Sequence, residues 1–170
     1  MKNRFHILSV LISIMLLFVS AAYADEDITP DEVIQKCQEA SKMLQEKGEA
    51  GLSLIQDKNG PFTWKGNYVW VAKCGEFTVS AHPFAEKLIG KDNSSLVDKK
   101  GNYFFMQLCD TADQTKEKGG WVEYWWPKKG VDEPVRKVAY ILQVPGTPYQ
   151  VSAGIYSETV TAADLNAKLK

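Results

Sequence analysis

The chain has 170 residues, with 20 basic and 21 acidic side chains and a formal net charge of −1. This length suits one ordinary domain, and the sequence lacks the basic stripe with interleaved aromatics that nucleic-acid binding requires. Aromatic residues make up 11% of the chain, and all five tryptophans lie between Trp64 and Trp126. This content predicts a substantial hydrophobic core, with rings left over for a small-molecule pocket.

Residues 1–24 have the features of a cleavable secretory signal. Lys2 and Arg4 precede an apolar run over residues 5–19, and Ala22-Tyr23-Ala24 fits the small-x-small cleavage pattern. The alternative is an uncleaved membrane anchor, but ~15 apolar residues are short for a span of about 20. We expect cleavage after Ala24, which removes two basic residues and leaves a domain of residues 25–170 with a net charge of −3. No later stretch reaches membrane-spanning length, so we expect a periplasmic or secreted protein without a further span.

The mature sequence is expected to begin with a long helix. Thr29 and Glu32 form a capping box, and Pro30 occupies the first helical position. Apolar residues recur at helical spacing as far as Ile55, with Gly48 and Gly51 predicting a bend or break between them. Strands at 67–72 and 77–81, joined by a turn at 73–76, then form a hairpin that a proline closes.

The second half adds one helix, three strands and a short final helix. Residues 84–102 are polar, with room for one or two helical turns, and residues 103–116 are expected to be helical until Gly119-Gly120. Strands follow at 121–126, 136–144 and 150–156, and a helix follows at 161–169. This order predicts an α+β fold with one five-stranded antiparallel sheet. The long helix would cover one face, and the short segments would cover a pocket on the other.

The three cysteines are Cys37, Cys74 and Cys109, and none lies in a C-x-x-C pattern. The sequence therefore gives no support for zinc, haem attachment or thioredoxin-like chemistry, and we expect no metal or cofactor. In an exported protein, one disulfide and one buried thiol are the plain expectation. Cys74 with Cys109 is the preferred pair, because Cys37 lies on the apolar face of the first helix; the other pairings stay open.

Between Gly48 and Tyr156 the chain resembles the single Cache sensor domains of the second type, which are PAS-like and extracytoplasmic. The resemblance rests on the order and spacing of several short segments, which are Lys47-Gly48-Glu49-Ala50, Asn59-Gly60-Pro61-Phe62-Thr63-Trp64, Tyr68-Val69-Trp70-Val71, Ala81-His82-Pro83, Leu88-Ile89-Gly90-Lys91, Asp98-Lys99-Lys100-Gly101, Gly120-Trp121-Val122-Glu123-Tyr124, Trp126-Pro127-Lys128, Lys137-Val138-Ala139-Tyr140, Val144-Pro145-Gly146-Thr147 and Ala153-Gly154-Ile155-Tyr156. The chain departs from the family at Lys73-Cys74-Gly75-Glu76, where the hairpin turn usually carries Asp-x-Asp-Gly. This departure favours Cys74 as a disulfide partner.

The resemblance implies a PAS-like fold that binds a small metabolite, often a short carboxylate, and signals to a chemoreceptor or kinase. No cytoplasmic signalling half and no second span follow Tyr156, so the chain resembles the free-standing exported members. We therefore expect a small-molecule ligand, with a carboxylate favoured, and a separate membrane receptor or kinase as partner.

Two side chains could supply charge or hydrogen bonds to such a ligand. His82 ends a strand beside the pocket, where its imidazole could contact a ligand or simply fix the following turn. Lys137 begins a strand, where it could compensate the desolvation of an anion or lie solvated at the strand end. The residues alone favour the solvated lysine, and the resemblance raises both side chains to candidate ligand contacts.

Aromatic residues are the expected walls of the pocket. Tyr68 and Trp70 share one strand face, as do Tyr124 and Trp126, and Tyr140 joins them as a candidate contact. Among acidic residues, Glu123 alone falls inside an aromatic strand. It could bind a ligand amine, but pairing with a basic residue of a neighbouring strand is the favoured interpretation.

No motif pairs a nucleophile with a base, and the mature chain has a single histidine, so we expect no enzymatic activity. The rival hypothesis is a structural or protein–protein interaction module with a Cache-like shape and a filled pocket. Its contact surface would then be the exposed turn at 127–134 or the C-terminal helix.

Overall fold

The computed structural model describes residues 28–128 and 130–169. The expected secretory signal lies outside the described residues. No helix within the described part of the chain is both long and apolar enough to cross a membrane.

Helix α1 (Pro30–Lys47) begins as the capping box predicts. The Thr29 side chain accepts a hydrogen bond from the Glu32 amide at 3.2 Å, and Asp31 and Glu32 lie in the first turn, where the helix dipole favours negative charge. The helix ends at Gly48, whose φ of 56° suits glycine. The expected bend is confirmed, because the chain turns through η1 (Gly48–Gly51) into α2 (Leu52–Gln56).

The expected five-stranded antiparallel sheet is confirmed, with the order β4-β3-β7-β6-β5. Its strands are β3 (Trp70–Lys73), β4 (Thr78–Ala81), β5 (Gly120–Trp126), β6 (Val135–Gln143) and β7 (Gln150–Tyr156). The turn between β3 and β4 is η2 (Cys74–Glu76).

The first predicted strand differs from the structure. Residues 67–72 are divided between β2 (Asn67–Tyr68) and β3, and β2 pairs with β1 (Thr63–Trp64) in a separate two-stranded sheet. The turn between them places Lys65 and Gly66 at φ angles of 45° and 74°, the positive values that a tight two-residue hairpin requires. Sequence analysis missed this hairpin because a lysine at the first central position is an uncommon turn signal.

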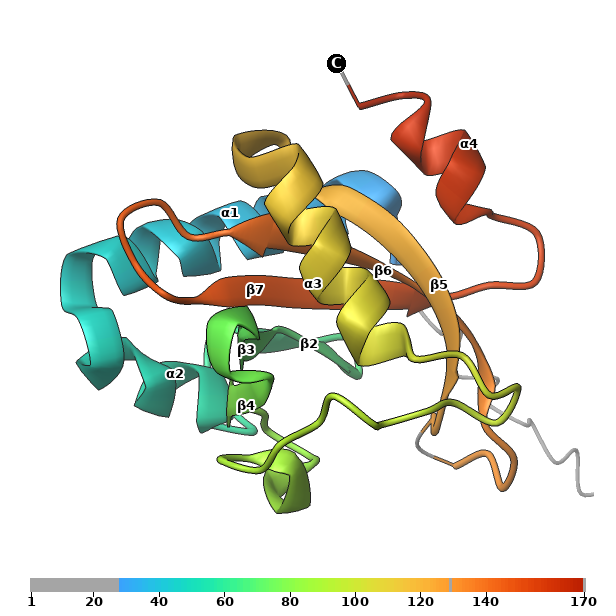
Figure 1. The fold of residues 1–170 in the computed structure, drawn as a ribbon, viewed down its shortest axis with the longest axis horizontal. Helices are drawn as coiled ribbons and strands as arrows, with labels where there is room; N and C mark the ends of the chain where they lie inside the picture. Colours follow the sequence, from blue (N-terminus) through green and yellow to red (C-terminus); the bar gives the residue numbers. More distant parts are fainter. Residues whose placement is uncertain (1–27, 129, 170) are drawn as a thin grey trace, which may run out of the picture.

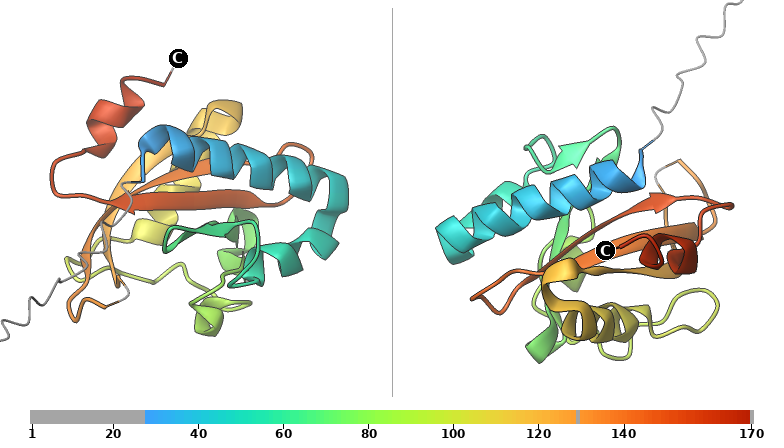
Figure 2. Two further views of the ribbon diagram at one scale, coloured as in Figure 1. Left: turned by 180° about the vertical axis from the view of Figure 1, so that it is seen from behind. Right: turned by 90° about the horizontal axis from the view of Figure 1, so that it is seen from above.

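The sheet lies between α1 and α3 (Phe104–Thr115), as Figure 1 and the right-hand view of Figure 2 show. Side chains alternate along β6, so Val138, Tyr140 and Leu142 belong to the core under α1. Ala139 and Ile141 belong to a second core, which α3 covers. The protein therefore has two apolar layers, one on each face of the sheet.

The segment between β4 and α3 covers the α3 side of the sheet and contains η3 (Glu86–Leu88). Asp98 holds its second half in place. Its carboxylate accepts hydrogen bonds from the Lys100 and Asn102 amides, the Asn102 side chain and the Trp125 amide, at 2.8–3.1 Å. Burial alone would raise the pKa of Asp98, but these hydrogen bonds outweigh it and hold the pKa below its ordinary value.

The short helix α4 (Ala162–Asn166) protects the outer edge of the sheet. The Asn166 side chain accepts from the Trp121 amide at 2.8 Å and donates to the Trp121 carbonyl at 2.9 Å. The Asn166 side-chain amide therefore pairs with both backbone polar groups of Trp121, on the open side of the edge strand β5. Such pairing stops an edge strand from recruiting another chain.

Candidate ligand-binding site

A small cavity lies between the sheet and its covering segment, on the face that α3 packs against. The cavity has a volume of about 20 Å³ and is partly open to solvent. This space holds about one water molecule. The lining residues are Tyr68, Trp70, Val79, His82, Leu88, Leu96, Phe104, Phe105, Tyr124 and Trp126.

His82 follows β4 and lines the cavity as a neutral hydrogen-bond donor. Its Nδ1 accepts from the Phe84 and Ala85 amides at 3.1 and 2.9 Å, so the proton lies on Nε2. Burial, with a smaller contribution from the charge of Lys137, lowers the pKa of His82 to about 3. The imidazole therefore fixes the following turn, which is one of the two roles that the sequence left open. Its Nε2–H group is free of these two bonds, and its contact with a ligand stays a prediction.

Lys137 is buried, with 0% of its surface exposed, although it lies near the start of β6. Its Nζ lies 3.3 Å from the Tyr68 hydroxyl, 4.4 Å from the centre of the Tyr68 ring and 5.3 Å from that of Tyr156. No carboxylate of the described residues forms an ion pair with it. Since a buried ammonium without a counter-ion is costly, this lysine is poised to accept an anion.

Three tyrosines surround this ammonium group. Burial raises the pKa of Tyr124 well above its ordinary value, and it likewise raises the pKa of Tyr156, with a further contribution from Tyr68. Both therefore stay protonated and can donate. The Tyr156 hydroxyl donates to the Pro127 carbonyl at 2.8 Å. Tyr68 both lines the cavity and contacts Lys137, which is not itself a lining residue.

Comparison with known proteins places the chain in a family. It matches the family model described as single Cache domain 2 over residues 1–168. The chain belongs to this family. The expected resemblance is thus confirmed, and the match is wider than residues 48–156, which carried the resemblance in the sequence.

A curated relative of this Cache domain is the methyl-accepting chemotaxis protein McpP of Pseudomonas putida. The two are 32% identical over 96 residues, which cover 56% of this chain and 17% of the relative. The chain therefore spans only a small part of that receptor.

Solved structures show the same fold at low sequence identity. One is a Cache chemosensory domain from a study of carboxylic acid recognition, with a TM-score of 0.66 and 23% identity over 75% of this chain and 92% of its own. Another is a periplasmic sensor domain of a chemotaxis protein, with a TM-score of 0.63 and 22% identity over 75% and 94%. A third, a methyl-accepting chemotaxis protein from Vibrio parahaemolyticus, has a TM-score of 0.61 and 15% identity over 75% and 88%.

Six of the seven candidate contacts lie together in the Cache domain. Five of these candidates line the cavity, namely Tyr68, Trp70, His82, Tyr124 and Trp126, and the sixth, Lys137, contacts Tyr68. Tyr140 is separated from them, because it packs against Trp121 in the core under α1, at 5.3 Å between ring centres. Its hydroxyl donates to the Lys118 carbonyl at 2.7 Å, so we leave Tyr140 out of the site.

Sequence analysis missed part of the cavity wall. Phe104 and Phe105, at the start of α3, face the aromatic strand residues, and the Phe104 ring stacks on Tyr124 at 4.5 Å between centres. These two phenylalanines at the start of the predicted helix were a usable signal, but tertiary packing determines which strand they face. Leu88 and Leu96 of the covering segment also line the cavity, although the polar composition of this segment predicts a solvent-exposed loop.

Glu123 pairs with Arg136 of the neighbouring strand, which is the favoured interpretation of its sequence position. Its carboxylate also accepts from the Ala162 amide at 3.2 Å, and Arg136 donates to the Ser157 and Val160 carbonyls at 2.9 and 2.8 Å. This acidic side chain is therefore committed to holding the segment before α4. A role in binding a ligand amine finds no support.

The preferred cysteine pairing is confirmed. Cys74, in the turn after β3, forms a disulfide with Cys109 in α3, and their Cα atoms are 5.4 Å apart. Cys37 is free and lies on the buried face of α1, where burial raises the pKa of its thiol.

Two other places among the described residues do not form a candidate site. A second hollow, of about 380 Å³, lies between the end of α3 and the turn after β6. Exposed Asp113, Lys116 and Glu117 line it, and this mixture of charges favours no single ligand chemistry. Across residues 28–128 and 130–169, no three histidine, cysteine or acidic side chains gather as metal ligands would.

Proposed function

We propose that this chain is an exported, non-catalytic sensor domain that binds a short-chain carboxylate, or a similar small metabolite, in the cavity beneath α3. The observation that carries the proposal is Lys137, an ammonium with 0% exposure and no carboxylate partner among the described residues. A carboxylate would supply the missing charge, and its hydrogen bonds with Lys137 would be charge-assisted. The carboxylic acid recognition named for one structural neighbour is consistent with this chemistry.

Each lining group has a role in this proposal. His82 donates from Nε2 to one carboxylate oxygen, and Lys137 binds the other after the Tyr68 hydroxyl moves aside. Trp70, Phe104 and Phe105 enclose the short hydrocarbon tail. The cavity is small, so even an acid of two to four carbons requires it to widen, and larger ligands require more; the lack of an acidic lining residue disfavours ligands with an amino group.

The size of such a ligand limits its affinity. The best very small ligands gain about 1.5 kcal/mol per non-hydrogen atom, so acetate, with four such atoms, cannot exceed about 6 kcal/mol. This corresponds to a dissociation constant of roughly 40 μM. A ligand screen therefore has to reach millimolar concentrations.

Thermal unfolding against small carboxylates, amino acids, amines and purines at ~5 mM tests the proposal. A ligand at about 100 times its dissociation constant stabilises the fold by ~2.7 kcal/mol, which raises the melting temperature by roughly 5–10 °C. A shift from one class of carboxylate, lost in Lys137→Ala and His82→Ala, supports the proposal. A flat response from ligand-free protein would favour the interaction module, whose association should then depend on residues 127–134.

We further propose that residues 1–24 are removed on export to the periplasm or the medium, and that the domain acts through a separate membrane receptor or kinase. The intact mass of the exported protein tests the cleavage. A pull-down from membranes, with and without acetate, tests the partner. Recovery of no receptor under either condition would contradict that part of the proposal.

A further inference from the structure

The disulfide joins the two walls of the cavity. One wall belongs to β2 and to β3 and β4, which form one end of the five-stranded sheet, and the other belongs to α3 and to β5, which forms the opposite end. Cys74 lies in the turn between β3 and β4, and Cys109 lies in α3. The 35-residue separation between them encloses six of the ten lining residues, namely Val79, His82, Leu88, Leu96, Phe104 and Phe105.

Non-covalent contacts hold these walls to different strands. Helix α3 packs on β5 and β6, whereas β3 pairs with β4 and β7. The Trp70 and Phe105 rings also meet across the gap, at 6.1 Å between centres. The disulfide is therefore the covalent tie that keeps α3 against the β3–β4 hairpin.

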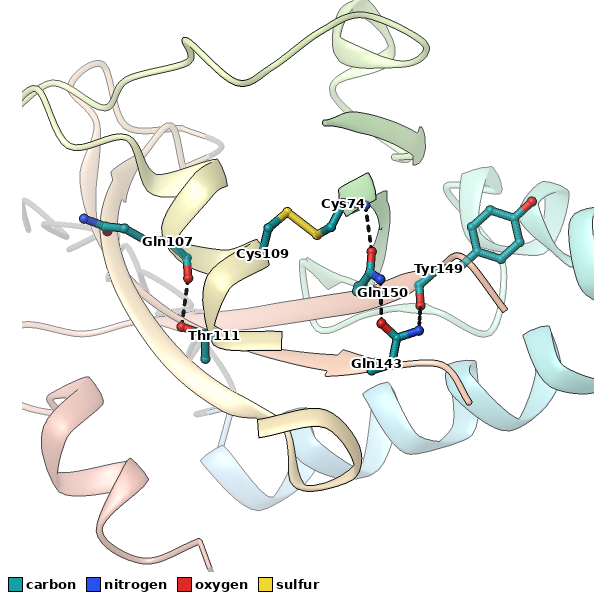
Figure 3. Close-up of a disulfide and its surroundings, with 7 residues drawn as sticks. All are labelled: Cys74, Gln107, Cys109, Thr111, Gln143, Tyr149 and Gln150. Atoms are coloured by element: carbon teal, nitrogen blue, oxygen red, sulfur yellow. Dashed lines mark hydrogen bonds between the residues drawn. A yellow bond between two sulfur atoms is a disulfide. The ribbon is translucent and has the colours of Figure 1, made fainter. Parts of the chain in front are cut away.

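Hydrogen bonds anchor one end of the disulfide independently of the sulfur atoms. The Cys74 amide donates to the Gln150 side chain at 2.8 Å, and Gln150 donates to Gln143 at 2.6 Å. Gln143 then donates to the Thr147 and Tyr149 carbonyls, and Figure 3 shows the bond to Tyr149. Breaking the disulfide leaves this anchor intact, so the freedom gained falls on α3 and the covering segment.

The two cysteine residues of the disulfide differ in exposure. Cys74 is half-buried in a turn whose next residues, Gly75 and Glu76, are exposed, whereas Cys109 is only 7% exposed. An external thiol therefore reaches Cys74 first. The third cysteine, Cys37, is buried on the opposite face of the sheet and cannot exchange with this pair without unfolding.

We propose that Cys74–Cys109 is a thiol–disulfide exchange site for an external dithiol, and that its redox state sets the ligand affinity of the cavity. The second part rests on the proposed carboxylate-binding function. A thiolate of the dithiol attacks the sulfur of Cys74, the disulfide bond breaks, and Cys109 leaves as a thiolate and takes a proton. The second thiol of the reagent then releases Cys74, so that the protein gains two electrons and two protons and the reagent becomes a disulfide.

Reduction is expected to weaken carboxylate binding without unfolding the domain. The test compares the oxidised protein with protein reduced by dithiothreitol, using acetate and propionate as probes in isothermal titration calorimetry. A Cys37→Ser background removes the third thiol, and a Cys74→Ser/Cys109→Ser variant gives a form that cannot form the disulfide. We expect the reduced protein and the double variant to bind at least tenfold more weakly than the oxidised protein.

Hydrogen exchange of both redox forms gives a readout that needs no ligand. Protection should fall in residues 82–109 on reduction, while α1 and the β6–β7 hairpin keep theirs. Unchanged exchange at 82–109, or a uniform loss of protection that includes α1, would overturn the proposal, as would equal affinity in both forms. If neither form binds acetate or propionate, the proposed ligand class fails, and the exchange pattern alone decides whether the disulfide closes the cavity.

Discussion

Replacing Lys137 with methionine separates a ligand-binding role from a structural one, because the two roles predict opposite effects on the ligand-free protein. Burying an ammonium group costs several kcal/mol even after relaxation. The Tyr68 and Tyr156 rings each offset about 0.5–2 kcal/mol of this cost, and the hydrogen bond to Tyr68 offsets roughly 1.5–3 kcal/mol. Methionine has a similar length and needs no counter-charge, so the ligand-free variant should be as stable as the natural protein or more stable, by up to about 2 kcal/mol.

The same variant should lose its carboxylate. A hydrogen bond to a charged group contributes about 1.5–3 kcal/mol, so affinity for acetate or propionate should fall at least tenfold. Urea unfolding measures the first effect and calorimetric titration measures the second, with Lys36→Met as the control. Lys36 forms an ion pair with Glu39 on the helix surface, and its loss should change stability by less than about 0.5 kcal/mol. Loss of more than about 1 kcal/mol in Lys137→Met without ligand would refute the reasoning, because the lysine would then be stabilising the fold.

Three further predictions concern the fold around the site. Folding lowers the pKa of His82 from an ordinary value of 6.5 to about 3, so between these pH values the unfolded chain binds a proton that the folded protein does not. The free energy of unfolding should therefore fall by up to about 2 kcal/mol as the pH is lowered from 7.5 to 5. Urea titrations of His82→Asn should show a flatter pH dependence. Gly119→Ala should cost at least about 2 kcal/mol in urea unfolding, because Gly119 has a φ of 64° and an added Cβ would lie 2.3 Å from the Tyr140 ring; an unchanged midpoint would contradict this. Asn166→Ala should cost about 1–2 kcal/mol and speed hydrogen exchange at the Trp121 amide, whereas exchange as slow as in the natural protein would show that α4 does not guard this edge.

Local patterns were sufficient to predict most of the secondary structure. Thr29, Pro30 and Glu32 determine where α1 begins, and alternation along a strand predicted that Tyr124 and Trp126 would face the same way. The same rule should have excluded one candidate, since Lys137 and Tyr140 are three positions apart in β6 and must point to opposite faces. Lys137 faces the cavity side, and Tyr140 therefore lies under α1.

Contacts between distant segments could not be predicted from such patterns. The full burial of Lys137 depends on Tyr68 and Tyr156, which reach it from two other strands. The neutral state of His82 depends on its burial and on the charge of Lys137, and its tautomer depends on two amides that the following turn presents to it. In each case the residue type suggested a function, while the environment that determines its charge came from segments distant in sequence or from backbone geometry.

The position of Tyr68 explains how the proposed ligand would compete for Lys137. In the structure the Tyr68 hydroxyl accepts a hydrogen bond from the Lys137 ammonium group. The distance of 3.3 Å is longer than the usual range of about 2.7–2.9 Å for a charge-assisted bond. A carboxylate would form the stronger interaction, but it needs more space than the 20 Å³ cavity offers. The Tyr68 ring would have to swing away to widen the cavity. Because this rearrangement costs free energy, the measured affinity should lie below the limit that ligand size alone sets.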